Sequence, residues 1–283
     1  MPRAEGPTLR RRRLGAELRR CREAAKLTQE QVSQRFEWHP AKVTRIETAK
    51  VSVTPRDVRD LLDMYGVDDR EYRDSLVDMA RSSREQSWWT QYRDILPPDS
   101  FVGFEAEAAA IRSWEPVVLP GLLQTEAYMR ALFAVSLSAE RLVLIDRITS
   151  LRLARQRRLR EDPPLKLFAI VDESVIRRPI GGRQVMAEQL RHLLAVSELP
   201  TVTLRVLPYD AGEHALLGVS IAILEFPGGA DPDIVYVEGP IRSRQFVRQP
   251  AEVGQYRDVF AQLSRRCLDQ QSTTVMIKSV LAA

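Results

Sequence analysis

The chain has 283 residues, of which 44% are hydrophobic and 28% are charged, and its formal net charge is +4. This composition is typical of a globular protein, and the length predicts about two domains. Its two cysteines, Cys21 and Cys267, exclude a disulfide framework and a cysteine-rich zinc site. No apolar run approaches the ~20 residues of a membrane span, and no apolar stretch follows the Arg-rich N-terminus as in a signal peptide. We therefore expect a cytoplasmic protein that contacts no membrane.

Positive charge is concentrated at the start of the chain. Residues 1–50 hold 13 Arg and Lys against 6 Glu, a net charge of +7. Residues 51–80 hold 4 Arg against 8 Asp and Glu, a net charge of −4, which leaves +1 for the remaining residues. A basic segment of this kind suits a polyanionic partner, and a merely solvated basic arm is the alternative.

The first two predicted helices are marked by apolar spacing and by a cap. A first helix buries a stripe that consists of Leu14, Leu18, Cys21 and Ala25. In that stripe Cys21 is a small core residue rather than a reactive thiol. A second helix opens at Thr28, which forms a capping box with Gln31, and it runs to about Phe36.

A third short helix begins after a very tight turn. His39 is its expected N-cap, with metal binding as the alternative, and Pro40 takes the first helical position. Two further helices follow, one opened by Thr54 and ended at Gly66 and one that starts after Asp68. The pattern predicts a five-helix all-α domain in residues 1–80 that contains a helix-turn-helix.

The string LTQEQVSQRFEWHPAKVTRIETAK, residues 27–50, resembles the repressor-type helix-turn-helix family that includes phage Cro and CI repressors. The resemblance implies that the helix Pro40–Thr48 enters the major groove of double-stranded DNA. Glu37 stands in the turn where the family usually has Gly. A residue other than Gly at positive φ is strained, and a carboxylate near phosphates weakens binding.

The same resemblance assigns candidate DNA contacts. Gln29 is expected to contact phosphate or to brace the recognition helix, and Arg45 to hold the DNA backbone or to brace Glu47. The candidates for base edges are Ala41, Lys42 and Thr44, with His39 and Pro40 alongside. A basic arm is expected to add phosphate or minor-groove contacts through Arg10, Arg11, Arg12 and Arg13.

Residues 81–164 are predicted to form a helical middle region, with Trp88 and Trp89 as anchors between the parts of the chain. Its helices are expected around 101–112, at 125–133 and from Ser138 to Arg160. The last of these carries seven arginines, at positions 141, 147, 152, 155, 157, 158 and 160. We expect a solvated face there, and a surface for an acidic partner is the alternative.

Residues 165–283 are predicted to form an α/β ligand- or partner-binding domain. Strands are expected at 165–173, 202–209, 219–226 and 233–239, the last two as a hairpin. Helices are expected at 182–198 and 251–269, followed by a frayed tail. The predicted fold class is therefore a multidomain α+β protein whose C-terminal part is a small mixed sheet with helices.

Several strings of this C-terminal part are distinctive: PGLLQTEAYMRAL, DESVIRRPIGG, QVMAEQLRHLL, VTLRVLPYDAGEH and DIVYVEG. The chain resembles actinobacterial regulators of the WhiJ type, in which a repressor-type helix-turn-helix is fused to an antitoxin-like domain. The resemblance implies a DNA-binding regulator whose C-terminal domain binds a small companion protein encoded nearby, a ligand, or its own copy.

An enzymatic function is the hypothesis that contrasts with this interpretation. Charged groups lie at predicted strand ends and loops, namely Asp172, Glu173, Arg177, Arg178, His214, Glu225 and Glu238. The metal-ligand spacings of a nuclease are absent, and Gly181-Gly182 lacks the Lys and Ser/Thr of a phosphate-binding loop. His192 lies in a predicted helix and reads as a surface or core histidine. We expect no enzymatic activity, metal or cofactor.

The sequence therefore predicts a sequence-specific DNA-binding transcriptional regulator, nucleoid-associated when bound to DNA. Because one recognition helix reads few base pairs, a homodimer on a palindromic operator is expected. The second hypothesis is an interaction protein that sequesters the companion protein and autoregulates its promoter. The third is a sensor that binds an anionic small-molecule effector, for which Arg177, Arg178 and His214 are the candidate residues.

Overall fold

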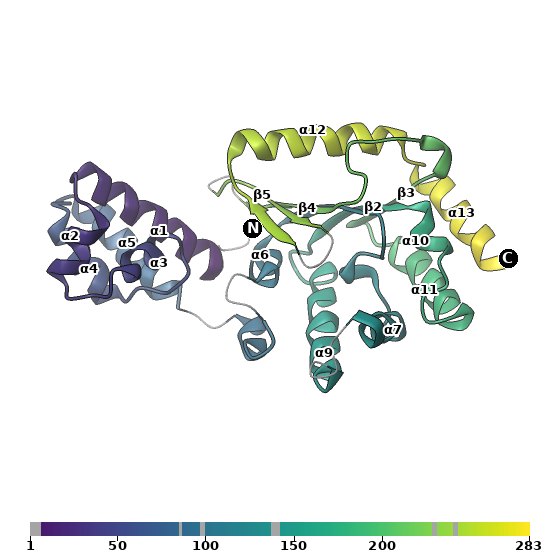
Figure 1. The fold of residues 1–283 in the computed structure, drawn as a ribbon, viewed down its shortest axis with the longest axis horizontal. Coiled ribbons are helices and arrows are strands. Elements are labelled where there is room, and N and C mark those ends of the chain that lie inside the picture. Colours follow the sequence, from purple (N-terminus) through teal and green to yellow (C-terminus); the bar gives the residue numbers. More distant parts are fainter. Residues whose placement is uncertain (1–6, 85–86, 97–99, 137–141, 228–230, 240–242) are drawn as a thin grey trace. The chain divides into compact units, whose positions relative to one another are not determined.

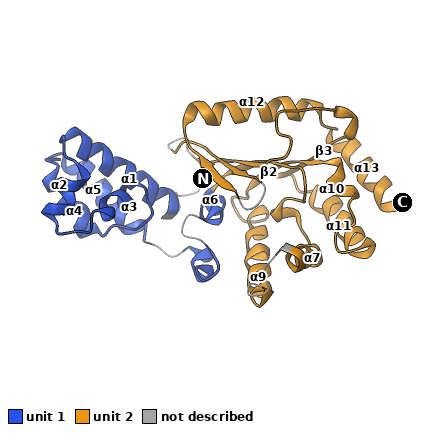
Figure 2. Cartoon of the chain, viewed as in Figure 1, with its two compact units in different colours: residues 1, 3–107 blue, residues 2, 108–283 orange. Residues whose placement is uncertain are grey.

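A computed structural model describes residues 7–84, 87–96, 100–136, 142–227, 231–239 and 243–283 (Figure 1). The chain forms two compact units, the first ending at Glu107 and the second beginning at Ala108 (Figure 2). Unit 1 is helical and unit 2 contains a six-stranded sheet, which confirms the predicted multidomain α+β class. Among the described residues, no helix has both the length and the apolar character needed to cross a membrane.

Unit 1 begins with the five predicted helices, and a short 3₁₀ helix and one more α-helix follow them. The elements are α1 (Pro7–Ala24), α2 (Gln29–Arg35), α3 (Ala41–Glu47), α4 (Pro55–Met64), α5 (Arg70–Ser82), η1 (Trp88–Tyr92) and α6 (Phe101–Glu107). The core shared by α1–α5 contains the predicted stripe of α1, including Cys21, which is 7% exposed. Trp88 and Trp89, predicted as anchors between parts of the chain, lie in η1, where Trp89 approaches Gly103 of α6.

Polar side chains cap the short helices as their sequence predicts. Thr28 accepts the amide proton of Gln31 at 3.1 Å, and the Gln31 side chain accepts the Thr28 N–H at 2.8 Å, which confirms the capping box. The side chain of Thr54 caps α4 by accepting the amide proton of Asp57. Such caps satisfy amides that a helix leaves without a partner at its start.

The start of α1 is capped by a residue far away in sequence. The Glu107 carboxylate accepts the N–H groups of Thr8 and Leu9 at 2.6 and 2.7 Å. Burial raises the pKa of Glu107, while these two amides act in the opposite direction. The end of α6 is thereby fixed against the start of α1.

Helix α1 and helix α3 meet at Gly15. A Cβ atom at this position would lie 2.6 Å from the carbonyl oxygen of Ile46 and 2.8 Å from that of Glu47. Real Cβ atoms do not approach a backbone oxygen so closely, so the contact requires glycine despite its low helix propensity.

The sheet of unit 2 has the strand order β3-β2-β1-β4-β5-β6. Its strands are β1 (Ala110–Glu115), β2 (Lys166–Asp172), β3 (Val202–Leu207), β4 (Ser220–Glu225), β5 (Ile234–Glu238) and β6 (Arg244–Val247). Strands β1, β2 and β3 are parallel, whereas β4, β5 and β6 join antiparallel. The four predicted strands, their mixed sheet and the β4–β5 hairpin are confirmed.

Helices cover both faces of this sheet. Figure 1 shows α12 (Pro250–Arg266) above the sheet, and α7 (Glu126–Ser136), α9 (Ile145–Gln156), α10 (Glu173–Arg177) and α11 (Arg183–Val196) below it. The core under α12 includes Trp114, Ile223, Val235 and Phe260. On the other side, the 3₁₀ helix η2 (Gly121–Leu123) contacts α9.

Several elements of unit 2 differ from the sequence prediction, among them β1, β6 and the C-terminal helix. Residues 110–115, expected as the end of a helix and a turn, form β1 between β2 and β4 and bury Ile111 and Trp114. Strand β6 was not predicted. The expected frayed tail is helix α13 (Gln270–Ala282), whose Thr273 accepts the N–H of Val206 on edge strand β3 at 3.2 Å.

Because β1 pairs within the sheet, residues 108–164 belong to the same compact unit as residues 165–283. The sequence predicted three domains, 1–80, 81–164 and 165–283. The two compact units show no boundary at position 164.

The expectation of a solvated arginine face before Arg160 is wrong for two arginines. Arg158, in η3 (Arg157–Leu159), is 1% exposed and donates to the carbonyl of Ala108 at 2.8 Å. Arg152 of α9 donates to the Gln124 side chain at 2.7 Å. The predicted cap Ser138, and Arg141, lie outside the described residues.

We expect Gly15→Ala to lower the free energy of unfolding of unit 1 by about 1–3 kcal/mol, because its methyl group would overlap the α3 carbonyls. Gly254→Ala in α12 is the matched control, since no heavy atom lies within 4 Å of the added Cβ. That control should gain up to about 1 kcal/mol from helix propensity. Scanning calorimetry measures both variants, and stabilisation by both would contradict the close approach.

Candidate nucleic-acid interface

The turn between α2 and α3 has the geometry that a helix-turn-helix requires. Glu37 has a φ of 53°, so the strained position predicted from the sequence is present. The Trp38 N–H donates to the Ser33 carbonyl at 2.9 Å, which closes the turn. The rings of Phe36 and Trp38 stack with centroids 5.0 Å apart and pack against the domain core.

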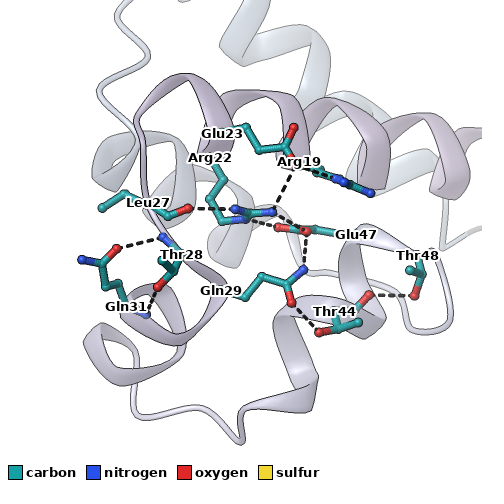
Figure 3. A network of polar contacts seen from close by, with 10 residues as sticks. All are labelled: Arg19, Arg22, Glu23, Leu27, Thr28, Gln29, Gln31, Thr44, Glu47 and Thr48. Atoms are coloured by element: carbon teal, nitrogen blue, oxygen red, sulfur yellow. Dashed lines mark hydrogen bonds and ion pairs between the residues drawn. The ribbon is translucent and has the colours of Figure 1, made fainter.

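A buried ion pair fixes the end of α3 to α1 (Figure 3). The Arg22 guanidinium donates to both Glu47 oxygens at 2.6 and 3.0 Å and to the Leu27 carbonyl at 2.8 Å. The side chains of Arg22 and Glu47 are only 9% and 3% exposed. The hydrogen bond with Glu47 raises the pKa of Arg22, so this charge is permanent.

Gln29, the first residue of α2, extends this network to the exposed face of α3. Its amide nitrogen donates to Glu47 at 2.7 Å, and its oxygen accepts the Thr44 hydroxyl proton at 2.7 Å (Figure 3). Of the two roles considered for Gln29, the structure shows the bracing of the recognition helix.

Arg45 does not brace Glu47, contrary to one of the two roles considered for it. Its Nε donates to the Ala41 carbonyl at 3.3 Å, and its side chain is exposed. The residue that braces Glu47 is Arg22, which was not predicted from the sequence. A signal was present, because Arg22 lies one helical turn after Leu18 of the buried stripe.

Helix α3 begins at Ala41, one residue later than predicted. The ring Nδ1 of His39 accepts the Ala41 N–H at 3.2 Å, and Pro40 has αR dihedral angles. This nitrogen is a cap acceptor in the structure, which supports the capping role of His39 over metal binding.

The candidate base-reading residues do not share one environment. Ala41, Thr44 and Arg45 are exposed together with Pro40. Lys42 is instead half-buried: its ammonium lies 3.4 Å from the centroid of the Trp38 ring and 3.8 Å from the Asp57 carboxylate. Lys42 therefore connects α3 to the turn and to α4, which leaves Ala41, Thr44 and Arg45 as the exposed side chains of this face.

The predicted basic arm is wrong as a structural element, because Arg10–Arg13 lie inside helix α1. Arg10 and Arg11 donate to the carbonyls of Ser82 and Ser83 at 3.4 and 3.2 Å, at the end of α5. Burial lowers the pKa of Arg11, and the charge of Arg93 adds to this effect. Of the four arginines, only Arg13 has an exposed side chain.

Two family models match the chain. Residues 13–76 match a helix-turn-helix domain, and residues 98–279 match a family described as "Domain of unknown function (DUF5753)". The chain belongs to the DUF5753 family. The searches of curated proteins and of solved structures gave no match. With its helix-turn-helix domain at the N-terminus, this DUF5753 protein is a DNA-binding regulator.

Two of the three candidate effector residues of the DUF5753 region, Arg177 and His214, have side-chain partners within the chain. Arg177 donates to Glu173 at 2.6 Å, and the other Glu173 oxygen accepts the Tyr209 N–H at 2.9 Å. His214 accepts the Leu216 N–H at 3.2 Å, and burial followed by the charge of Arg266 lowers its pKa. Among the described residues, no hydrogen bond or ion pair joins His214 to Arg177 or to the exposed Arg178.

The carboxylates considered for metal chemistry are also engaged. Asp172 caps α10 through the Ser174 amide at 2.9 Å, Glu225 pairs with Arg112 at 2.7 Å, and Glu238 pairs with Arg244 at 3.2 Å. In the part of the chain that the structure describes, no group of three or more His, Cys, Asp or Glu residues could hold a metal ion. Burial also lowers the pKa of His192, which is half-buried.

We expect Arg22→Met to lower the free energy of unfolding by about 3–5 kcal/mol, because it leaves the Glu47 carboxylate buried without its counter-ion. The double variant Arg22→Met, Glu47→Leu should recover much of this loss. Urea denaturation of both variants gives the free energies. Equal stability of the single and the double variant would show that Glu47 needs no buried partner. The exposed pair Arg81–Asp78 serves as control, since Arg81→Met should change stability by less than about 1 kcal/mol.

Proposed function

We propose that this DUF5753 protein is a sequence-specific transcriptional regulator that reads its operator with the helix Pro40–Thr48. The observation that carries the proposal is the buried Arg22–Glu47–Gln29 network, which holds the exposed Thr44 by its hydroxyl. A recognition side chain that is fixed before binding loses less conformational entropy on DNA.

The exposed face of α3 suggests which base features are read. The Thr44 hydroxyl is engaged with Gln29, so its methyl group remains for a thymine methyl, and Ala41 suits the same contact. Arg45 reaches a guanine edge or a phosphate. Lys42, held by Trp38 and Asp57, contributes to the position of α3.

In this proposal the protein is a cytoplasmic regulator of the WhiJ type without enzymatic activity, and its DUF5753 region modulates operator binding. Repressor-type helix-turn-helix domains bind palindromes as dimers, so two copies of the chain act together. The four carboxylates considered for metal chemistry are engaged within the chain, Asp172 as a helix cap and the other three in ion pairs, which supports the non-enzymatic assignment.

We expect Thr44→Ala to reduce discrimination between the operator and its single-base variants about tenfold. Arg45→Ala should weaken binding, and a phosphate role would reduce the salt slope of the affinity by about 1. Binding to promoter fragments, including that of its own gene, is measured across a salt series. Arg70→Ala, an exposed arginine at the start of α5, is the control and should bind as the wild type does.

A wild-type protein that binds no fragment above the non-specific level would refute the operator-reading proposal. The alternative would then take its place: an antitoxin-like interaction protein that sequesters a small companion protein. Exposed apolar residues favour a protein partner for unit 2, since Val135 of α7 and Val143, just before α9, are 85% and 83% exposed. Apolar side chains so exposed are typical of interaction surfaces when they cluster.

We expect the wild type to sediment as a dimer at micromolar concentration, and Val135→Glu, Val143→Glu to sediment as a monomer with weakened operator binding. Charged side chains there would oppose burial of the apolar surface against a second copy. Val275→Glu in α13, where the side chain is 62% exposed, is the matched control and should stay dimeric. A monomeric wild type in analytical ultracentrifugation would contradict the dimer.

A further inference from the structure

The sheet face turned away from α12 carries polar, small and aromatic side chains over four strands. Ser113, Ala222, Tyr236 and Phe246 are successive cross-strand partners on β1, β4, β5 and β6. Two residues further along these strands, Ser220, Glu238 and Arg244 are partners in the same way. Glu115 of β1 continues that row, because its carboxyl group is hydrogen-bonded to the Ser220 side chain. We call these residues the polar sheet face.

Two arginines of α9 lie close to this face. A Cβ on Gly121 would be 3.6 Å from both terminal nitrogens of Arg155 and 3.9 Å from one of Arg152, so both guanidiniums approach η2. The charge of Arg152 acts on the Glu115 carboxyl, and that of Arg155 acts on the Tyr236 hydroxyl. Helix α9 thus brings two cations to the polar sheet face.

The floor of this face combines aromatic and small residues. The Tyr236 and Phe246 rings have centroids 5.1 Å apart, and both side chains are half-exposed. Ala222 and Ser113 beside them are 8% and 4% exposed. The Ser113 hydroxyl has no hydrogen-bond partner among the described residues. A buried hydroxyl without a partner is unfavourable, which points to a partner group supplied from outside the chain.

The carboxyl group of Glu115 has a raised pKa. Burial raises its pKa to about 8, the charge of Glu238 adds to this effect, and Ser220 and Arg152 oppose it. Tyr236 and Tyr128 also face this carboxyl, and the Glu115 charge contributes to their raised pKa values. At neutral pH Glu115 is therefore mostly protonated and can donate a hydrogen bond.

We propose that the polar sheet face is the effector site of the DUF5753 region and that it binds a small aromatic carboxylate. The ligand carboxylate pairs with Arg152 and Arg155, whose planar guanidiniums match its geometry. The ring lies on Tyr236 and Phe246, and a polar ring substituent meets Ser113 and Glu115. Glu238 repels a dianion such as phosphate more strongly than a monoanion, so a monoanion is favoured.

This site deepens the proposed function, because effector binding would be the input that controls the operator. Ligand binding is nevertheless tested without DNA. Isothermal titration calorimetry of the full chain uses salicylate, 4-hydroxybenzoate and anthranilate as probes, with acetate and inorganic phosphate for comparison. We expect one site per chain for at least one aromatic carboxylate, and at least about tenfold weaker binding of acetate and phosphate.

Variants locate the site. Arg155→Gln should weaken binding of the aromatic carboxylate about tenfold, and Ser113→Ala should weaken it without loss of thermal stability. Arg157→Gln, an exposed arginine of η3, is the matched control and should bind as the wild type does. Affinity should also fall as pH rises from 7 to 9 through the Glu115 pKa of about 8, and Glu115→Gln should remove that dependence.

Three results would overturn the effector site: no binding of any of the three aromatic carboxylates, equal binding of inorganic phosphate, or unchanged affinity in Arg155→Gln. Failure of the operator proposal is distinguishable from these. If calorimetry shows ligand binding but the protein binds no DNA selectively, the effector site is supported and only the operator-reading proposal is refuted.

Discussion

The position of helix α3 depends on one buried ion pair. Transfer of Arg22 and Glu47 from water into the domain is costly, and only good geometry with full hydrogen bonding compensates for it. Both conditions hold, since two contacts of 2.6 and 3.0 Å join the pair and the Leu27 carbonyl and Gln29 amide occupy further sites. The pair thereby joins α1, the segment before α2, the first residue of α2 and the last residue of α3. The close contact at Gly15 is with the backbone carbonyls of Ile46 and Glu47, so packing and electrostatics position the same end of α3.

The features of unit 1 that could be predicted from sequence are local ones. The capping box of Thr28, the cap of His39 and the apolar stripe of α1 each arise within a few residues of the chain. The partner of Glu47 is 25 positions away and could not be found in that way. Helix geometry alone disfavours Arg45 for this role, because residues two apart on a helix point away from one another. The helical spacing that identified Leu18 also places Arg22 on the buried side, although a charge there does not fit an apolar pattern.

In unit 2 the missed elements are those whose stability is non-local. Strand β1 follows the Ala-rich residues 106–109, which favour a helix, and becomes a strand because β2 and β4 pair with both of its edges. Helix α13 contains Thr273, Thr274 and Val275, residues of low helix propensity, yet Asp269 caps it and Thr273 satisfies an amide of edge strand β3. The polar sheet face also depends on cross-strand register, which joins residues more than a hundred positions apart, such as Ser113 and Ala222.

An effector of the DUF5753 region can change operator affinity only if it binds the two states of the regulator with different affinity. Few residues separate the polar sheet face from Glu107 along the chain. Ser113 and Glu115 lie on β1, which starts at Ala110, and Glu107 precedes that strand by three positions. Glu107 in turn caps α1, which carries both Gly15 and Arg22. Helix α6 lies within the matched DUF5753 region but packs in unit 1. The start of the family match at residue 98 therefore differs from the boundary between the two compact units, which follows Glu107.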